Sequence, residues 1–204
     1  MMIKIGLTGG IACGKSLATH YFRQLNITVL DSDQIARQLV KPNQPALKEI
    51  TDIFGENCLN KNGSLNRTWM REKVFSNPQQ LALLESILHP LIRLNLKKQI
   101  KNCNNSDTKK AYIVLDIPLL IEKSFTNLVD RILVIDCSQN QQIKRAVKRD
   151  QSRVVKIERI IQMQISRSTR LKVADDILDN RGTKNELYLQ IQALHQRYLK
   201  ISSL

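Results

Sequence analysis

The chain has 204 residues, 42% of them hydrophobic, a length that predicts one α/β core with insertions. Its 32 basic and 18 acidic side chains give a net charge of +14, which predicts a polyanionic partner: nucleic acid, a membrane surface or a nucleotide substrate. No apolar run approaches the length of a membrane span, and the first residues lead directly into a strand, so we expect neither membrane insertion nor a signal peptide. The widely spaced cysteines indicate neither a zinc site nor a disulfide framework and favour the reducing cytoplasm: Cys13, Cys58, Cys103 and Cys137.

The segment IGLTGGIACGKSLA, residues 5–18, matches the phosphate-binding P-loop, because Gly9, four intervening residues, Gly14, Lys15 and Ser16 fit its pattern. A short apolar strand precedes it and a helical pattern follows it, as the motif requires. Glycines let backbone N–H groups approach phosphate oxygens, and the helix N-terminus favours the anion. We therefore expect Lys15 to reach the outer phosphates and the Ser16 hydroxyl to bind Mg²⁺. The alternative is a glycine-rich turn with an unrelated lysine.

A second short strand, residues 28–30, is followed by Asp31-Ser32-Asp33 and a helix at 34–40. Ligands bind at the carboxyl ends of strands in open α/β sheets, which makes both carboxylates candidates for the site. Capping of the helix is the alternative role for Asp33.

A helical insertion is predicted between the second and third strands. Helices are expected at 46–54 and 67–75, followed by a long helix that Pro78 opens, and the polar run 102–110 closes the insertion. His89-Pro90 is expected to interrupt the long helix, with Arg93 one turn later. A packing or kink role for this histidine is the alternative.

Two further strands are predicted, at 111–116 and 131–136. The first is apolar throughout, as a parallel strand buried on both faces would be, and it ends in Asp116. An acid at this position of a P-loop fold commonly holds Mg²⁺, whereas capping of the next turn is the alternative.

A basic segment follows a helix predicted at 139–150. Ten basic and only two acidic residues lie between Lys144 and Lys172. Arginines in a section with few large apolar residues are what a mobile phosphate-clamping lid requires, and a solvated face is the alternative. The arginines in question are Arg145, Arg149, Arg153, Arg167 and Arg170.

A fifth strand at 176–180 and a turn at Gly182 lead into a last helix, which Thr183 and Glu186 open as a capping box. Strands that alternate with helices predict a five-stranded parallel sheet covered by helices on both faces.

The chain resembles the dephospho-CoA kinases, of the nucleoside-monophosphate-kinase-like P-loop group, over nearly its whole length. LTGGIACGKS is similar to the family's P-loop, DSDQIAR (31–37) to its DxD segment, LHPLI (88–92) to its HP motif and LDIPLLIE (115–122) to the end of its third strand. Further matches are Gln142, Arg145, Arg149, Asp150, Gln164, Arg170, Ala174-Asp175, Asn180 and Gly182.

The resemblance implies transfer of the γ-phosphoryl group of ATP to the ribose 3′-hydroxyl of dephospho-CoA, the last step of coenzyme A synthesis. It implies a P-loop kinase core at 1–31, 111–143 and 173–204, an acceptor-binding insert at 32–110 and a basic helical lid at 144–172. Positioning and charge neutralisation carry such a transfer. We expect a cytoplasmic monomer that uses ATP, dephospho-CoA and Mg²⁺ and binds neither nucleic acid nor membrane.

The resemblance also implies roles for single residues. Asp33 is expected as the base facing the 3′-hydroxyl, with Lys15, Arg145 against adenine and Arg149 on phosphates completing the catalytic set. ATP-binding residues are expected to be Gly9, Gly10, Ile11, Ala12, Cys13, Gly14, Lys15, Ser16, Leu17 and Asn180. Acceptor-binding residues are expected to be Asp31, Asp33, Arg37, His89, Arg93 and Asp116, and metal ligands to be Ser16 and Asp116.

Three positions depart from the family's usual P-loop. Ala12 and Cys13 stand where glycine and serine are usual, and they serve if their backbone adopts the required dihedral angles. Leu17 stands where threonine is frequent and cannot donate a hydroxyl near the α-phosphate, which predicts weaker ATP binding. Cys13, at a helix N-terminus beside a lysine, is expected to be the most reactive thiol if it reaches solvent; a space-filling role is the alternative.

Two other functions stay open on the sequence. A kinase of the same fold acting on another acceptor, such as a nucleoside monophosphate, would need the same lid but not the DxD and HP motifs. A nucleic-acid-binding regulator switched by ATP would suit the charge, but only 4% of residues are aromatic and no helix-turn-helix pattern occurs.

Overall fold

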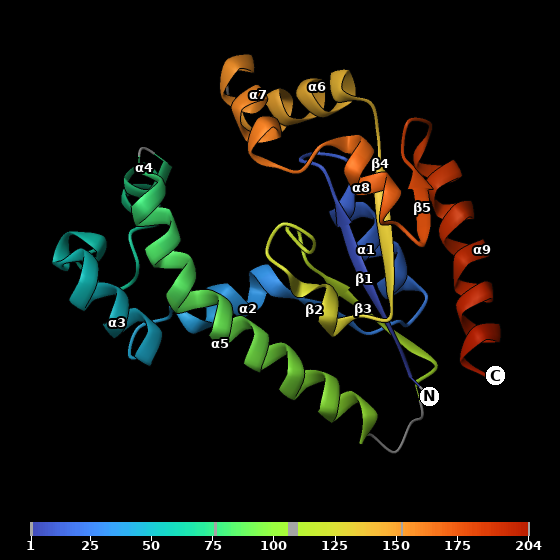
Figure 1. Ribbon diagram of the computed structural model, residues 1–204, viewed down its shortest axis with the longest axis horizontal. Helices are drawn as coiled ribbons and strands as arrows, with labels where there is room; N and C mark the ends of the chain where they lie inside the picture. Colours follow the sequence, from blue (N-terminus) through green and yellow to red (C-terminus); the bar gives the residue numbers. More distant parts are fainter. Residues whose placement is uncertain (1, 76, 106–109, 152, 204) are drawn as a thin grey trace. The chain divides into compact units, whose positions relative to one another are not determined.

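We describe a computed structural model of the chain, covering residues 2–75, 77–105, 110–151 and 153–203. All five strands pair in parallel in the order β2-β3-β1-β4-β5, which confirms the predicted sheet (Figure 1). The strands are β1 (Ile3–Gly9), β2 (Val29–Asp31), β3 (Tyr112–Asp116), β4 (Arg131–Asp136) and β5 (Asp176–Asp179). The strand ends lie in register at one edge, where Asp116 is the partner of both Leu7 and Asp31.

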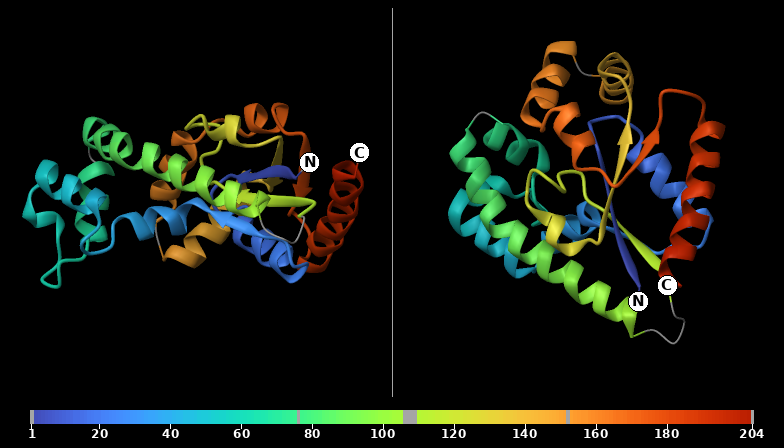
Figure 2. Two further views of the ribbon diagram at one scale, coloured as in Figure 1. Left: turned by 90° about the horizontal axis from the view of Figure 1, so that it is seen from below. Right: turned by 45° about the vertical axis from the view of Figure 1, so that its right-hand side comes forward.

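One face of the sheet packs against α1 (Lys15–Gln24) and α9 (Lys184–Ser202), and Figure 2 shows α9 running along it. Side chains alternate between the two faces of a strand, so the apolar runs of β1, β3 and β4 supply both faces. The cluster on the helix-covered face includes Ile5, Leu7, Phe22, Val114, Leu133, Ile135, Leu178, Leu187 and Ile191. On the other face Gly6 lies so close to Leu120 that an added Cβ would be 2.8 Å from its side chain.

Polar contacts also join α9 to the strands, at the edge opposite the carboxyl ends. The Tyr112 hydroxyl lies 2.8 Å from His195 Nδ1, and Tyr198 donates to Asp176 Oδ2 at 2.9 Å. Arg131 Nε donates to the same oxygen at 2.9 Å. Burial lowers the pKa of His195 below its ordinary value of 6.5. The buried carboxylate of Asp176 is thus paired with hydrogen-bond donors, as a charge removed from water requires.

The chain divides into two compact units, residues 1–31 with 103–204, and residues 32–102. The first holds the sheet and, after β4, the helices α6 (Gln139–Asp150), α7 (Val154–Met163) and α8 (Arg167–Lys172). A short 3-10 helix, η2 (Phe125–Leu128), precedes β4. The lid predicted at 144–172 thus packs as part of the first unit, and its movement stays a prediction.

The second unit is helical and has a core of its own. Its elements are α2 (Ser32–Leu39), α3 (Pro45–Phe54), the 3-10 helix η1 (Glu56–Cys58), α4 (Arg67–Phe75) and α5 (Pro78–Asn104). Its buried cluster contains Val40, Leu47, Ile50, Cys58, Met70, Val74 and Ile87. One antiparallel bridge joins Leu59 and Leu65. The predicted helices at 46–54 and 67–75 are thereby confirmed, while the predicted linker 102–110 falls partly within α5 and partly outside the described residues.

The expected interruption of the long helix at His89-Pro90 is wrong, because α5 continues through Pro90. A proline removes one backbone hydrogen bond, but here buried Ile87 and Ile92 anchor the helix on both sides of it. None of the helices in the described part of the chain, α5 included, combines the length and apolar character that crossing a bilayer requires.

Candidate active site

The predicted P-loop connects β1 to α1 and has the backbone geometry of an anion cradle. Gly14 lies at φ 104° and Ala12 at φ 57°, both in the left-handed region. A Cβ at Gly14 would lie 2.1 Å from Asn180 Nδ2, so only glycine fits there. Ala12 adopts the required conformation despite its side chain.

The start of α1 offers unpaired donors. Among the residues that the structure describes, no protein acceptor is bonded to the backbone N–H groups of Gly14, Lys15 and Ser16. Free N–H groups at a helix N-terminus, together with the helix dipole, attract an anion. Ser16 is exposed in this turn. Leu17, by contrast, packs partly buried against the core and donates its N–H to Gly14 O at 3.0 Å.

Lys15 is held by a buried carboxylate at the end of β3. Its Nζ lies 2.6 Å from Asp116 Oδ1, while Thr19 Oγ1 donates to Asp116 Oδ2 at 2.9 Å. The Asp116 side chain is 5% exposed and that of Lys15 19%. Thr19 has no role in the sequence analysis, although its position one helical turn after Lys15 is a signal that could have suggested one.

Oxygen ligands gather beside this pair. Asp31, at the end of β2, is the register partner of Asp116, and Ser16 lies one residue after Lys15. Hydroxyl and carboxylate oxygens are the ligands that Mg²⁺ prefers, so this donor set fits the ion. In the described part of the chain no three His, Cys, Asp or Glu side chains are grouped to hold a metal.

Cys13 does not reach solvent, so the condition on which its predicted reactivity depends is not met, and its burial agrees with the alternative, a space-filling role. It is 2% exposed, within the core, and lies beside Cys137, which follows β4 and is 1% exposed. The Cys137 thiol donates to Cys13 Sγ at 2.8 Å. This hydrogen bond lowers the pKa of Cys13 and raises that of Cys137.

Asn180, directly after β5, is bonded to the P-loop, and its predicted role in nucleotide binding stays a prediction. Its Nδ2 donates to Cys13 O at 2.6 Å, and its own carbonyl accepts from Arg145 Nη2 at 2.9 Å. Arg145 Nη1 is buried and, within the described residues, has no partner. An unpaired buried donor is costly in the free protein, and a ligand acceptor would satisfy it.

Three other arginines of the basic segment have acidic partners. Exposed Arg149 pairs with its neighbour Asp150 at 2.7 Å, and Arg167 donates from Nε to Asp136 Oδ1 at 2.8 Å. Arg170 is 6% exposed and lies 3.8 Å from Glu122. Of these partners only Asp150 is near in sequence, which explains why the segment looks unpaired when read from sequence alone.

The predicted acceptor residues other than Asp31 and Asp116 belong to the second unit. Asp33 and Arg37 are exposed one turn apart on α2, and because α2 begins at Ser32, Asp33 lies inside its first turn. His89 and Arg93, one turn apart on α5, line a cavity of about 370 Å³. These four residues therefore form one pair on α2, Asp33 with Arg37, and one pair on α5, His89 with Arg93.

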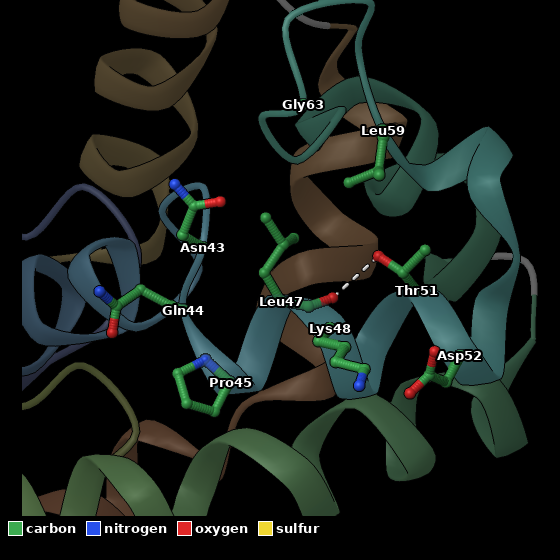
Figure 3. A pocket seen from close by; sticks show the side chains of 9 residues that line it. All are labelled: Asn43, Gln44, Pro45, Leu47, Lys48, Thr51, Asp52, Leu59 and Gly63. Atoms are coloured by element: carbon green, nitrogen blue, oxygen red, sulfur yellow. Dashed lines mark hydrogen bonds between the residues drawn. The ribbon is translucent and has the colours of Figure 1, made fainter.

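A larger cavity in the second unit, of about 610 Å³, has no counterpart in the sequence analysis (Figure 3). It lies beside α3, where Leu47, Leu59 and Lys48 line it, and Thr51 Oγ1 donates to Leu47 O at 2.8 Å. Its lining comes from residues along α3 and from the loops before α3 and after η1, so no simple sequence motif marks it.

The comparisons with known proteins agree with this geometry. A family model described as dephospho-CoA kinase matches residues 3–186. The dephospho-CoA kinase of Coxiella burnetii is 44% identical over 202 residues, covering 98% of this chain and 99% of that protein. That of Idiomarina loihiensis is 41% identical over 199 residues, covering 98% and 96%.

Solved structures extend the likeness to three dimensions. Dephospho-CoA kinase from Campylobacter jejuni matches with a TM-score of 0.73 at 26% identity, over 98% of each chain. A crystal structure from Thermus thermophilus matches with a TM-score of 0.80 at 26% identity, over 96% of this chain and 97% of that one. Sequence and structure agree over nearly the whole length, and the chain therefore belongs to the dephospho-CoA kinase family.

Proposed function

We propose that the protein transfers the γ-phosphoryl group of ATP to the ribose 3′-hydroxyl of dephospho-CoA and releases ADP and coenzyme A. The observation that carries this proposal is the anion cradle at the start of α1, with its unpaired amides and Lys15, in a chain of this family. The 3′-oxygen attacks the γ-phosphorus, the bond from that phosphorus to the β–γ bridging oxygen breaks, and the hydroxyl proton passes to a base.

On the donor side, the P-loop holds the phosphates of ATP. Lys15 leaves Asp116 to contact the outer phosphates, and the amides of the loop surround them. The buried, unpaired Nη1 of Arg145 supports a place for its guanidinium against the nucleotide, with Asn180 beside it. Arg149, now paired with Asp150, moves to phosphate when the basic segment closes. Ser16 and Asp116 are the residues that would hold Mg²⁺, whose charge neutralises phosphate oxygens.

On the acceptor side, Asp33 takes the proton of the 3′-hydroxyl. Its exposed carboxylate, in the first turn of α2, is accessible to a substrate hydroxyl. In this proposal Asp31 and Asp116, at the carboxyl edge of the sheet, bind the acceptor on the side of the first unit. Arg37, on α2, binds it from the second unit. His89 and Arg93, which share a cavity on α5, bind the remainder of the acceptor.

The charge of the protein supports two anionic substrates. A net charge of +14 attracts both ATP and dephospho-CoA and speeds their encounter. All proposed residues come from one chain, so we expect a monomer to be active, and four cysteines spaced far apart in the sequence suit the reducing cytoplasm.

An acceptor panel tests the proposal. Purified protein with MgATP should form ADP at a high rate with dephospho-CoA and hardly at all with AMP or CMP. Lys15→Ala should abolish this turnover, whereas Lys148→Ala, an exposed lysine of α6, should retain it. Turnover of AMP comparable to that of dephospho-CoA would overturn the proposal in favour of a nucleoside monophosphate kinase.

A further inference from the structure

Two glutamine side chains bond to the backbone of Ile11 in the P-loop. The backbone N–H of Ile11 donates to Gln164 Oε1 at 3.0 Å, and Gln142 Nε2 donates to the carbonyl of the same residue at 3.0 Å. Gln142 is 6% exposed and lies so close to the loop that a Cβ at Gly10 would be 2.1 Å from its Nε2. Both peptide groups of Ile11 are therefore fixed by side chains far away in the sequence.

Gln142 lies just before the basic segment, and Gln164 lies within it. Gln142 is in the first turn of α6, and Gln164 follows the last residue of α7, where its own N–H donates to Ile161 O at 3.1 Å. The next residue, Ile165, is fixed in turn, because its carbonyl accepts from Arg170 at 3.0 Å and its N–H donates to Glu122 at 3.2 Å. Both glutamines belong to the same compact unit as the P-loop.

Peptide planarity gives these bonds a consequence for the cradle. In a trans peptide the C=O and the following N–H point in opposite directions, so Gln142 sets the direction of the Ala12 N–H by holding the Ile11 carbonyl. Ala12 is left-handed at φ 57°, a conformation that a residue with a Cβ adopts only with outside support. Asn180 acts in the same way on the Cys13 carbonyl and so on the Gly14 N–H.

We propose that Gln142 and Gln164 are positioning residues that keep the P-loop in its phosphate-binding form. Neither needs to touch the nucleotide, since each acts through Ile11. Loss of either bond lets the strained Ala12 peptide relax and turns its N–H away from the phosphates. The inference rests on the part of the proposed function that places ATP phosphates in this cradle, and not on the identity of the acceptor.

The hydrogen-bond directions provide a sharp test. Gln142 donates and Gln164 accepts, so Gln164→Glu keeps its bond, whereas Gln142→Glu loses its donor and faces a carbonyl with a carboxylate. Both variants add the same charge beside the same residue. A difference between them reports the hydrogen bond and not the charge.

The readout is the Kd of the non-hydrolysed analogue adenylyl imidodiphosphate with Mg²⁺, measured by calorimetry. Gln142→Met and Gln164→Met should each raise this Kd about five- to tenfold, the scale of one lost neutral hydrogen bond with some strain. Gln142→Glu should weaken binding at least as much, and Gln164→Glu should stay within about twofold of wild type. Gln162→Met, a change at an exposed glutamine of α7, is the matched control and should match wild type.

Further measurements separate positioning from general destabilisation. The KM for dephospho-CoA and the melting temperature without nucleotide should stay close to wild type in Gln164→Met. The double variant should bind no more weakly than the weaker single variant, because both bonds hold one residue. Additive losses, or single variants indistinguishable from Gln162→Met, would overturn the inference. Wild-type protein that binds the analogue but leaves dephospho-CoA unphosphorylated would overturn the proposed function and leave this inference standing.

Discussion

Replacing Asp116 by asparagine tests whether the ion pair with Lys15 stabilises the empty P-loop. The carboxylate accepts from Lys15 Nζ at 2.6 Å and from Thr19 Oγ1 at 2.9 Å, and its side chain is 5% exposed. Removing one partner of a fully buried pair costs about 3–5 kcal/mol. Lys15 is 19% exposed and can turn toward water, so we expect a smaller loss, about 2–3 kcal/mol.

Chemical and thermal unfolding without nucleotide measures this loss. For a chain of this size, about 2–3 kcal/mol corresponds to a fall in melting temperature of roughly 4–12 °C. Asp130→Asn is the control, because its pair with Lys4 at 2.9 Å is a surface contact with side chains 34% and 27% exposed. It should cost about 0–1 kcal/mol. Equal losses of unfolding free energy in the two variants would refute the claim that the ion pair between Lys15 and Asp116 stabilises the nucleotide-free P-loop.

Other expectations concern the base, the basic segment, the thiols and pH. Asp33→Asn should keep ATP binding but lower kcat by roughly 10² or more, and a near wild-type kcat would leave Asp33 only a role in its helix. Hydrogen exchange in residues 144–172 should slow when an ATP analogue and dephospho-CoA are both bound; unchanged exchange would favour a merely solvated face. Peroxide should oxidise Cys13 and Cys137 to a disulfide, because their sulfurs are in contact and both side chains are too buried for rapid alkylation. Peptide mass spectra in which Cys13 is alkylated before this disulfide forms would contradict the prediction. Because burial lowers the pKa of His195, this residue contributes to the free energy of unfolding above pH 6.5, and the contribution is lost as pH falls through the folded-state pKa. The unfolding free energy of wild type relative to His195→Gln should therefore fall from pH 7.5 to 5. A difference that stays constant over this range would contradict the lowered pKa of His195.

Local patterns predicted the core of the fold well. The apolar run at 131–136 became β4 with the predicted bounds, and Thr183 and Glu186 form the predicted capping box. Each of these features is decided by neighbours in the chain, which a sequence displays directly. Pro90 shows the limit, since tertiary packing on both sides of it overrides the local preference for a break.

The site was predictable where a motif names it and unpredictable where distant residues meet. The P-loop can be predicted from the spacing of its residues alone. Asp116 can be predicted as a site residue because it ends an apolar, buried strand. The contact of Cys13 with Cys137 joins positions 124 residues apart, and Gln164 meets Ile11 across 153 residues. No periodicity or charge count reports such pairs, because they depend on how the elements pack.

The central claim is most directly tested by following the phosphoryl group itself. Protein incubated with ATP labelled in its γ-phosphoryl group, Mg²⁺ and dephospho-CoA should yield labelled coenzyme A, with the label in a phosphomonoester on the ribose 3′-oxygen. Mass and phosphorus NMR spectra of the isolated product locate the label. Label that appears only in inorganic phosphate, or at another position of the acceptor, would contradict the account.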